Sequence, residues 1–158
     1  MTSYLSDTRI RSETQIWADK VHKLTSKIDE KNNLLKSLKS EIDSINASIN
    51  NVDYILCRSN YNDYDSKIND LIQKRNKSKS KLTKNNLQNQ INDLKSKKAS
   101  CANKMKLIAN SNGFLTSVYS VIEKTRNANL ISQLIVDLKQ QRDNANKQWN
   151  YWHKQSIV

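Results

Sequence analysis

Only a few side chains in this sequence could take part in catalysis or metal binding, and none has the spacing that such chemistry needs. The two histidines are His22 and His153, and neither has a neighbour three or four residues further on that would complete a metal site. Acidic pairs such as Asp29–Glu30 fall mostly on solvated faces of the helices expected below. A nucleophile elbow, a phosphate-binding glycine loop and a zinc-helix signature are all missing. We therefore expect no catalytic residue, no metal site and no cofactor, and a protein that is not an enzyme.

Composition indicates an elongated all-α domain. The chain has 158 residues, no proline and one glycine, Gly113, so it lacks the residues that usually form the tight turns of a sheet. Apolar residues make up 36% of the chain, below the roughly 45–50% of ordinary globular proteins. That share is too small for a thick core but sufficient for the thin seam of a helical bundle or coiled coil. We expect residues 1–158 to form one helical-bundle domain.

A heptad stripe predicts the first helix, at about residues 8–57. Steps of four and three residues reach fourteen positions, of which only Thr14 and Lys31 are not apolar. Such a period is typical of a long helix that buries one narrow seam against a partner helix. The positions are Ile10, Thr14, Trp17, Val21, Leu24, Ile28, Lys31, Leu35, Leu38, Ile42, Ile45, Ile49, Val52 and Leu56. Arg58 to Asn60 offers a polar turn after this helix.

Two further long helices are expected, at about residues 61–110 and 114–155. The second seam begins at Tyr61 and Tyr64, stops after Ile72 and resumes out of phase at Leu87, which indicates either an interruption or a break of this helix near residues 73–86. We favour one interrupted helix over two, because no glycine or proline lies in the gap. Asn110 to Gly113 is the best turn signal in the chain. The third seam reads Ala128, Ile131, Ile135, Leu138, Arg142, Ala145, Trp149 and Trp152.

Short turns would fold three such helices antiparallel, into an elongated up-down-up bundle. This fold places Cys57 and Cys101 near opposite ends, too far apart for a disulfide, and we expect two separate thiols. It also gathers six aromatic residues at one end, where they either close the bundle or form a partner-binding surface: Tyr54, Tyr61, Tyr64, Trp149, Tyr151 and Trp152. The thin seams leave further apolar positions only partly covered, which suits lateral packing with another helical chain: Ile16, Leu34, Ile55, Ile72, Leu130 and Leu134.

Positive charge is concentrated in the second half of the chain. Residues 71–158 hold seventeen Lys or Arg and four Asp or Glu, a net charge of +13. The densest part is a candidate anion-binding stretch, formed by Lys74, Arg75, Lys77, Lys79, Lys81 and Lys84. On a continuous helix these side chains would spread around the circumference. They either solvate the helix, contact an acidic protein or bind a phosphate backbone. Membrane binding is disfavoured, because no helix pairs a broad apolar face with a basic one.

The first residues of the sequence do not resemble a signal peptide. Residues 1–11 contain Asp7, Arg9 and Arg11 and no apolar run, unlike a signal peptide. No later stretch approaches the roughly 18 apolar residues of a membrane span. We expect a cytoplasmic protein. Export by a route that needs no cleaved leader stays an alternative.

The long helices without proline resemble the small α-helical partner proteins of bacterial type VII secretion, which include WXG relatives and the proteins that accompany LXG toxins. Tyr61…Asp65 and Tyr119…Glu123 match the spacing of the Tyr-x-x-x-Asp/Glu export signal of that group. The turn at residues 110–113 departs from the group in lacking Trp-x-Gly. The resemblance implies a helical bundle that pairs with the helical region of a toxin and presents it for export.

These observations favour a non-enzymatic helical interaction module. It would act as an adaptor or as a secretion chaperone or targeting partner, and its partner would be a helical protein such as a secreted toxin or a second copy of the chain. The alternative is a basic nucleic-acid-binding protein of a phage or mobile element, which would bind the phosphate backbone through the second half of the chain.

Overall fold

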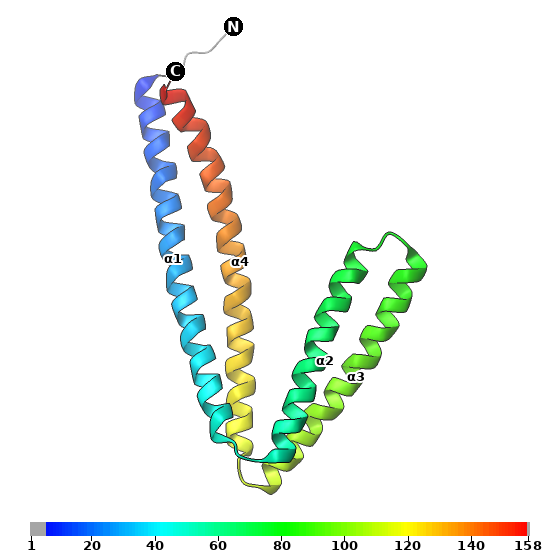
Figure 1. Ribbon diagram of the computed structural model, residues 1–158. Helices are drawn as coiled ribbons and strands as arrows, with labels where there is room; N and C mark the ends of the chain where they lie inside the picture. The colour runs from blue at the N-terminus through cyan, green and yellow to red at the C-terminus, as the bar shows by residue number, and fades with distance from the viewer. Residues whose placement is uncertain (1–5, 158) are drawn as a thin grey trace. The chain divides into compact units, whose positions relative to one another are not determined.

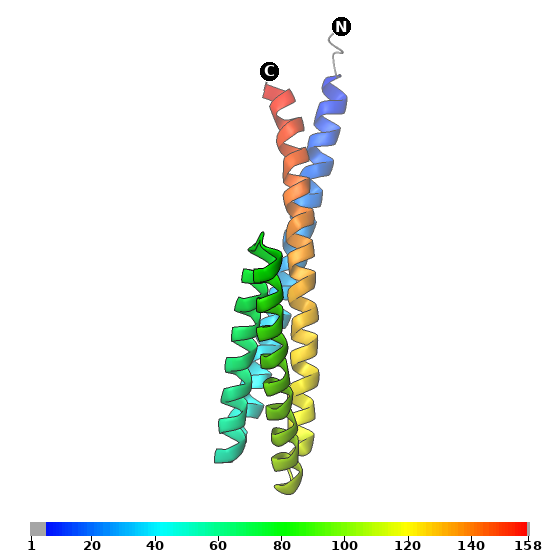
Figure 2. The same cartoon turned by 90° about the vertical axis from the view of Figure 1, so that its right-hand side faces the viewer.

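The computed structural model describes residues 6–157, and this part of the chain forms four α-helices and no strand. They are α1 (Asp7–Ser48), α2 (Val52–Lys77), α3 (Lys81–Ser111) and α4 (Leu115–Ile157). Helix α1 pairs with α4 and α2 pairs with α3, each pair antiparallel (Figures 1 and 2). The all-α class is confirmed, whereas the prediction of three helices is wrong.

The chain divides into two compact units. Unit 1 consists of residues up to 43 and from 123 onward, and unit 2 consists of residues 44–122. Helices α1 and α4 each belong mainly to unit 1, but their residues 44–48 and 115–122 belong to unit 2. None of the helices in the described range 6–157 carries an apolar stretch long enough to cross a membrane.

The first turn lies at residues 49–51, which corrects the predicted helix over residues 8–57. Asn51 caps α2, because its side-chain oxygen accepts a hydrogen bond of 2.9 Å from the Tyr54 backbone N–H. The turn shifts the phase of the apolar stripe, so that Val52 is 80% and Leu56 60% exposed while Tyr54 is 1% exposed. The stripe thus runs on in the sequence past the point where the helix ends. The expected turn at Arg58 lies inside α2.

A second correction concerns residues 73–86, where the chain reverses direction instead of continuing as one helix. The turn is Ser78 to Ser80, so the chain breaks the helix without glycine or proline, whose absence had favoured one interrupted helix. Ser80 accepts from the Thr83 backbone N–H at 3.3 Å and caps α3, while the Ser78 backbone N–H donates to the Arg75 and Lys74 carbonyls. Residues 73–81 hold no apolar side chain and Leu82 is 71% exposed, so no buried contact opposes the break.

The turn between α3 and α4 is confirmed where the sequence placed it. Gly113 has a φ of 77°, in the left-handed region that other residues seldom adopt. The Asn112 backbone N–H donates to the Ile108 carbonyl at 3.0 Å, and the Phe114 N–H donates to the Ala109 carbonyl at 2.9 Å. Helix α4 therefore begins at residue 115, within one residue of the prediction.

Unit 1 buries a thin seam between α1 and α4. Ile28, Ile135 and Leu138 are buried at its centre. Leu24, Leu35 and Ile131 pack around them. The predicted stripe is buried or half-buried at every position from Ile10 to Ile49. One of its two polar members, Thr14, donates its hydroxyl to the Ile10 carbonyl at 2.7 Å, which satisfies the hydroxyl within its own helix.

Unit 2 has its core where its turns meet. Ile49, Tyr54, Ala109 and Val118 are buried together there, and Phe114 meets the Tyr54 ring edge-on with centroids 5.2 Å apart. Further along the α2–α3 seam, Ile68 and Ile91 are 4% and 0% exposed. An ion pair between Lys98 and Asp65 joins the two helices at 2.7 Å.

Candidate interaction sites

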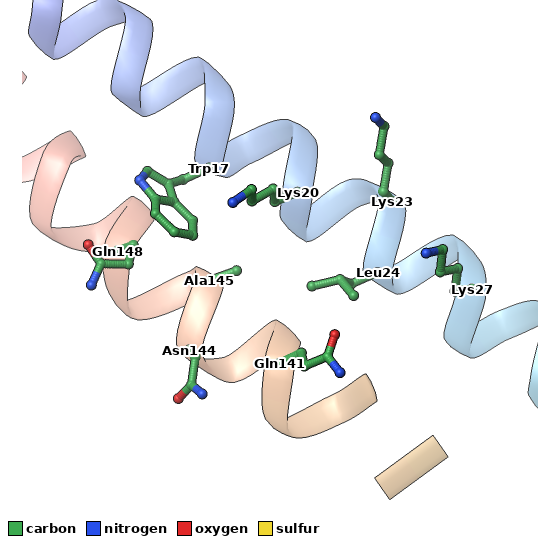
Figure 3. Close-up of a pocket in the computed structure, with 9 residues that line it drawn as sticks. All are labelled: Trp17, Lys20, Lys23, Leu24, Lys27, Gln141, Asn144, Ala145 and Gln148. Carbon is green, nitrogen blue, oxygen red and sulfur yellow. The ribbon is translucent and has the colours of Figure 1, made fainter. Parts of the chain in front are cut away.

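A groove runs between α1 and α4 within unit 1 (Figure 3). It has a volume of about 550 Å³. Trp17 and Leu24 point from α1 toward α4, and the small Ala145 on α4 leaves space opposite them. The remaining lining side chains are polar: Lys20, Lys23, Lys27, Gln141, Asn144 and Gln148.

The groove is electropositive and amphipathic. Its lining contains three lysines and, among residues that the structure describes, no acidic side chain. The Lys20 Nζ lies 4.4 Å from the centroid of the Trp17 ring, within the range of a cation–π contact. A ligand that fits this surface therefore carries negative charge beside an apolar group.

Exposed apolar residues lie on the same side of the hairpin as the groove. Each residue of the groove wall directly precedes a seam residue, as Lys23 precedes Leu24 and Asn144 precedes Ala145. The same relation holds for five large side chains of unit 1 that are 40–65% exposed: Ile16, Leu34, Leu130, Leu134 and Tyr151. In an α-helix a shared offset from the seam means a shared side. We refer to these five residues together with the groove as the apolar flank.

The opposite side of the same hairpin is mostly polar. Residues that directly follow a seam residue include Asp29, Asn32 and Ser132, and Val136 is an apolar exception that is 57% exposed. The hairpin of unit 1 is therefore asymmetric, with one flank suited to apolar contacts and the other to water.

The six predicted aromatic residues are divided between the two units. Tyr54, Tyr61 and Tyr64 belong to unit 2, whereas Trp149, Tyr151 and Trp152 belong to unit 1. Gathering all six at one end required a three-helix fold, and the described residues form four helices. Each set therefore has its own surroundings.

In unit 2 the tyrosines pack rather than project. Tyr54 is 1% exposed, so it offers a partner almost no surface, and burial raises the pKa of its hydroxyl while the nearby Arg58 charge opposes that rise. Tyr61 and Tyr64 are half-buried in the α2–α3 seam, and Lys98 lies 5.0 Å from the Tyr61 ring centroid. Burial would by itself lower the pKa of Lys98, but its hydrogen bond to Asp65 and the charges of Asp65 and Tyr61 raise it.

In unit 1 one of the three aromatic residues is well exposed. Trp152 is 9% exposed and lies 5.5 Å from the Arg9 guanidinium, while Trp149 stacks on His153 at 4.5 Å. Tyr151 is 51% exposed and meets Trp152 edge-on. Tyr151 therefore has the exposure that a contact residue needs, and it lies on the apolar flank.

The six cationic residues of the candidate anion-binding stretch lie together at the α2–α3 turn, which we call the basic tip: Lys74, Arg75, Lys77, Lys79, Lys81 and Lys84. All except Arg75 are exposed. Arg75 donates to the Gln88 side-chain oxygen and so joins α2 to α3 beside the turn. Residues 71–92 contain no acidic residue that could neutralise the tip. The reversal of the chain thus concentrates charges that a continuous helix would have spread apart.

The cysteines also lie elsewhere than expected. Cys57 and Cys101 were placed near opposite ends of a three-helix bundle, but both belong to unit 2 and lie on the paired helices α2 and α3. Both are half-buried free thiols.

Within residues 6–157 no three His, Cys, Asp or Glu side chains are grouped so that they could hold a metal ion. His22 is exposed, and His153 packs on Trp149.

Comparisons with protein-family models, curated proteins and solved structures find no match to the chain.

The groove was not anticipated from the sequence, although the partly covered positions Ile16 and Leu134 were a signal of the side on which it lies.

Proposed function

We propose that this chain is a non-enzymatic helical interaction module that binds an amphipathic helix of a protein partner along the apolar flank of α1 and α4. The observation that carries the proposal is the asymmetry of this hairpin, in which exposed apolar residues and the groove share one side. A helix that packs into the groove between two helices would convert a thin two-helix seam into a three-helix core.

The magnitudes favour a partner that is both apolar and acidic. Covering the exposed halves of five large apolar side chains would contribute on the order of 4–7 kcal/mol. The loss of translational and rotational freedom on association costs about 4–15 kcal/mol, so apolar contact alone gives weak binding at best. Acidic residues opposite Lys20, Lys23 and Lys27 would add charge pairs and fix the register of the partner helix.

The spacing of the flank sets the length of the partner segment. Ile16 and Leu34 are 18 residues apart on α1, which corresponds to about 27 Å of helix. The three groove lysines lie between them. The partner helix is therefore about 18 residues long, apolar near both ends and acidic at its centre. The resemblance to type VII secretion partner proteins favours the helical region of a secreted toxin, and the chain would then act as its adaptor or chaperone.

Titration with a synthetic helix tests this proposal. The probe is a helical peptide of about 18 residues with leucines near both ends and glutamates at its centre, and its matched control carries lysines in place of the glutamates. We expect the acidic peptide to bind more tightly, by at least about tenfold. Leu134→Glu should weaken binding by about tenfold or more, whereas Val136→Glu, a similarly exposed position on the polar side of α4, should not. Equal effects of the two substitutions would refute the apolar flank as the binding surface.

The basic tip supports nucleic-acid binding as a second candidate function. Six cations flank the turn between α2 and α3 with no acidic residue from position 71 to 92, and they form a compact site for a phosphate backbone. Fluorescence anisotropy with single-stranded DNA at increasing salt tests it, since each phosphate contact contributes about 0.7 to the slope of log affinity against log salt. Lys79→Gln with Lys84→Gln should lower that slope by about 1.4. The control pair Lys36→Gln with Lys39→Gln, at exposed positions of α1, should leave it unchanged.

A further inference from the structure

Cys57 on α2 and Cys101 on α3 lie equally far from the turn that joins these two helices. Cys57 lies 20 residues before Lys77, the last residue of α2, and Cys101 lies 20 residues after Lys81, the first residue of α3. In an antiparallel helical hairpin, residues at equal distances from the turn lie opposite each other, because both helices rise by the same amount per residue.

Contacts on either side of the cysteines fix this register. Lys98 lies against Tyr61 and bonds Asp65, so residues 61–65 of α2 face residue 98 of α3. One layer further from the α2–α3 turn, the seam residue of α2 is Cys57, four residues before Tyr61. The seam residue of α3 in that layer is Cys101, three residues after Lys98. Beyond them Tyr54 and Met105 share the core of unit 2. The two cysteines therefore form one layer of the seam, between layers whose contacts are known.

Facing positions of such a seam are within reach of a disulfide. Packed helices have axes about 8–10 Å apart and carry their Cα atoms at a radius of about 2.3 Å. Two Cα atoms that face each other are then roughly 3.4–5.4 Å apart, and this range overlaps the roughly 4.4–6.8 Å that disulfides need. Both thiols are half-buried, so a small oxidant can reach them without unfolding the hairpin.

We propose that Cys57 and Cys101 are a site of reversible oxidation, at which an intramolecular disulfide clamps α2 to α3. The oxidant is a low-molecular-weight disulfide such as oxidised glutathione. One cysteine thiolate attacks it and releases one reduced thiol, and the second cysteine thiolate then displaces the other. The protein loses two protons and two electrons, and the small disulfide becomes two thiols. The clamp fixes the hairpin that carries the basic tip, and it does not depend on the proposed partner of unit 1.

Equilibration of the full chain in mixtures of reduced and oxidised glutathione tests the proposal. After quenching and alkylation, the intact mass shows whether the two cysteines have lost two hydrogens, gained glutathione or been alkylated. We expect the intramolecular disulfide to dominate, with an effective thiol concentration at least about tenfold above that of the same chain unfolded in urea. The oxidised protein should also melt at least about 5 °C higher than the reduced protein.

Moving one thiol off the seam provides the matched control. The double variant Cys101→Ser with Asn103→Cys keeps two thiols in nearly the same sequence but puts one of them at an exposed position of α3. It should collect glutathione adducts under conditions in which the natural chain closes its disulfide. The proposal is overturned if the natural chain forms mostly glutathione adducts or intermolecular disulfides. It is equally overturned if the control closes as readily, or if oxidation leaves the melting temperature unchanged.

Discussion

Replacing Tyr54 and Leu56 by alanine, one at a time, tests the turn at residues 49–51. If the apolar stripe continued in one helix to residue 57, Leu56 would be buried and Tyr54 would lie beside the seam. In the structure Tyr54 is 1% exposed and Leu56 is 60% exposed. Tyr54→Ala should therefore be the more destabilising substitution, whereas an uninterrupted helix would make Leu56→Ala the more destabilising one.

The magnitudes follow from burial. Truncating a buried aromatic side chain to alanine costs about 3–5 kcal/mol, and the edge-on contact with Phe114 adds roughly 0.5–1.5 kcal/mol. The better helix propensity of alanine offsets about 0.5 kcal/mol, so we expect Tyr54→Ala to lower the free energy of unfolding by about 3–6 kcal/mol. Leu56→Ala removes three carbons that are mostly in water already, and its cost should be about 1 kcal/mol or less.

Urea unfolding followed by far-ultraviolet circular dichroism measures both effects. The comparison is valid where the m-value of each variant equals that of the natural chain, since a change in m would report a changed native or denatured state. A large loss for Leu56→Ala together with a small loss for Tyr54→Ala would refute the phase shift, and with it the division of the first predicted helix into α1 and α2.

Three further predictions concern single positions. Burial raises the pKa of the Tyr54 hydroxyl, so its contribution to stability is complete below the ordinary tyrosine pKa of about 10 and is lost as the pH rises through the folded-state pKa. Tyr54→Phe should therefore make stability less dependent on pH above about 10, as measured by thermal unfolding at alkaline pH. Lys31 is half-buried in the α1–α4 seam, and Lys31→Leu should raise the free energy of unfolding by up to about 1 kcal/mol, whereas a loss would show that the lysine has a buried partner. Gly113→Ala should lower the free energy of unfolding by about 1–2 kcal/mol through backbone strain at a φ of 77° alone, since no atom lies within 4 Å of an added Cβ. A variant that melts at the same temperature as the natural chain would contradict this.

Sequence patterns predicted the seams well and the turns unevenly. The heptad stripe from Ile10 to Ile49 is buried or half-buried throughout, because a 3.5-residue period can be satisfied only on one side of a helix. The turn at Gly113 was found because a positive φ strongly favours glycine. The other two turns use Asn51 and Ser80 as helix caps, and such residues are frequent enough on helix surfaces that neither marks a break by itself.

The candidate sites were predicted as sets of residues but not as surfaces. The basic stretch was identified from composition, and only the reversal at residues 78–80 shows that its charges meet at a tip. The apolar flank required two helices to be paired before Leu34 and Leu134 could be assigned to the same side as the groove. A sequence gives the offset of each residue from its own seam, but it does not say which two seams come together.

The sequence by itself determined that this protein is helical, because the absence of proline, the single glycine and the heptad period leave no other way to bury its apolar residues. It also determined which side of each helix is buried, except at the start of α2, where the stripe placed Val52 and Leu56 in the seam and the structure exposes them. Tertiary structure alone decided which helix pairs with which, since capped helix ends at residues 49–51 and 78–80 set the partners while local periodicity is the same for any pairing. That choice brings Cys57 opposite Cys101 and leaves one flank of the α1–α4 hairpin apolar, because which residues face each other depends on where the chain turns.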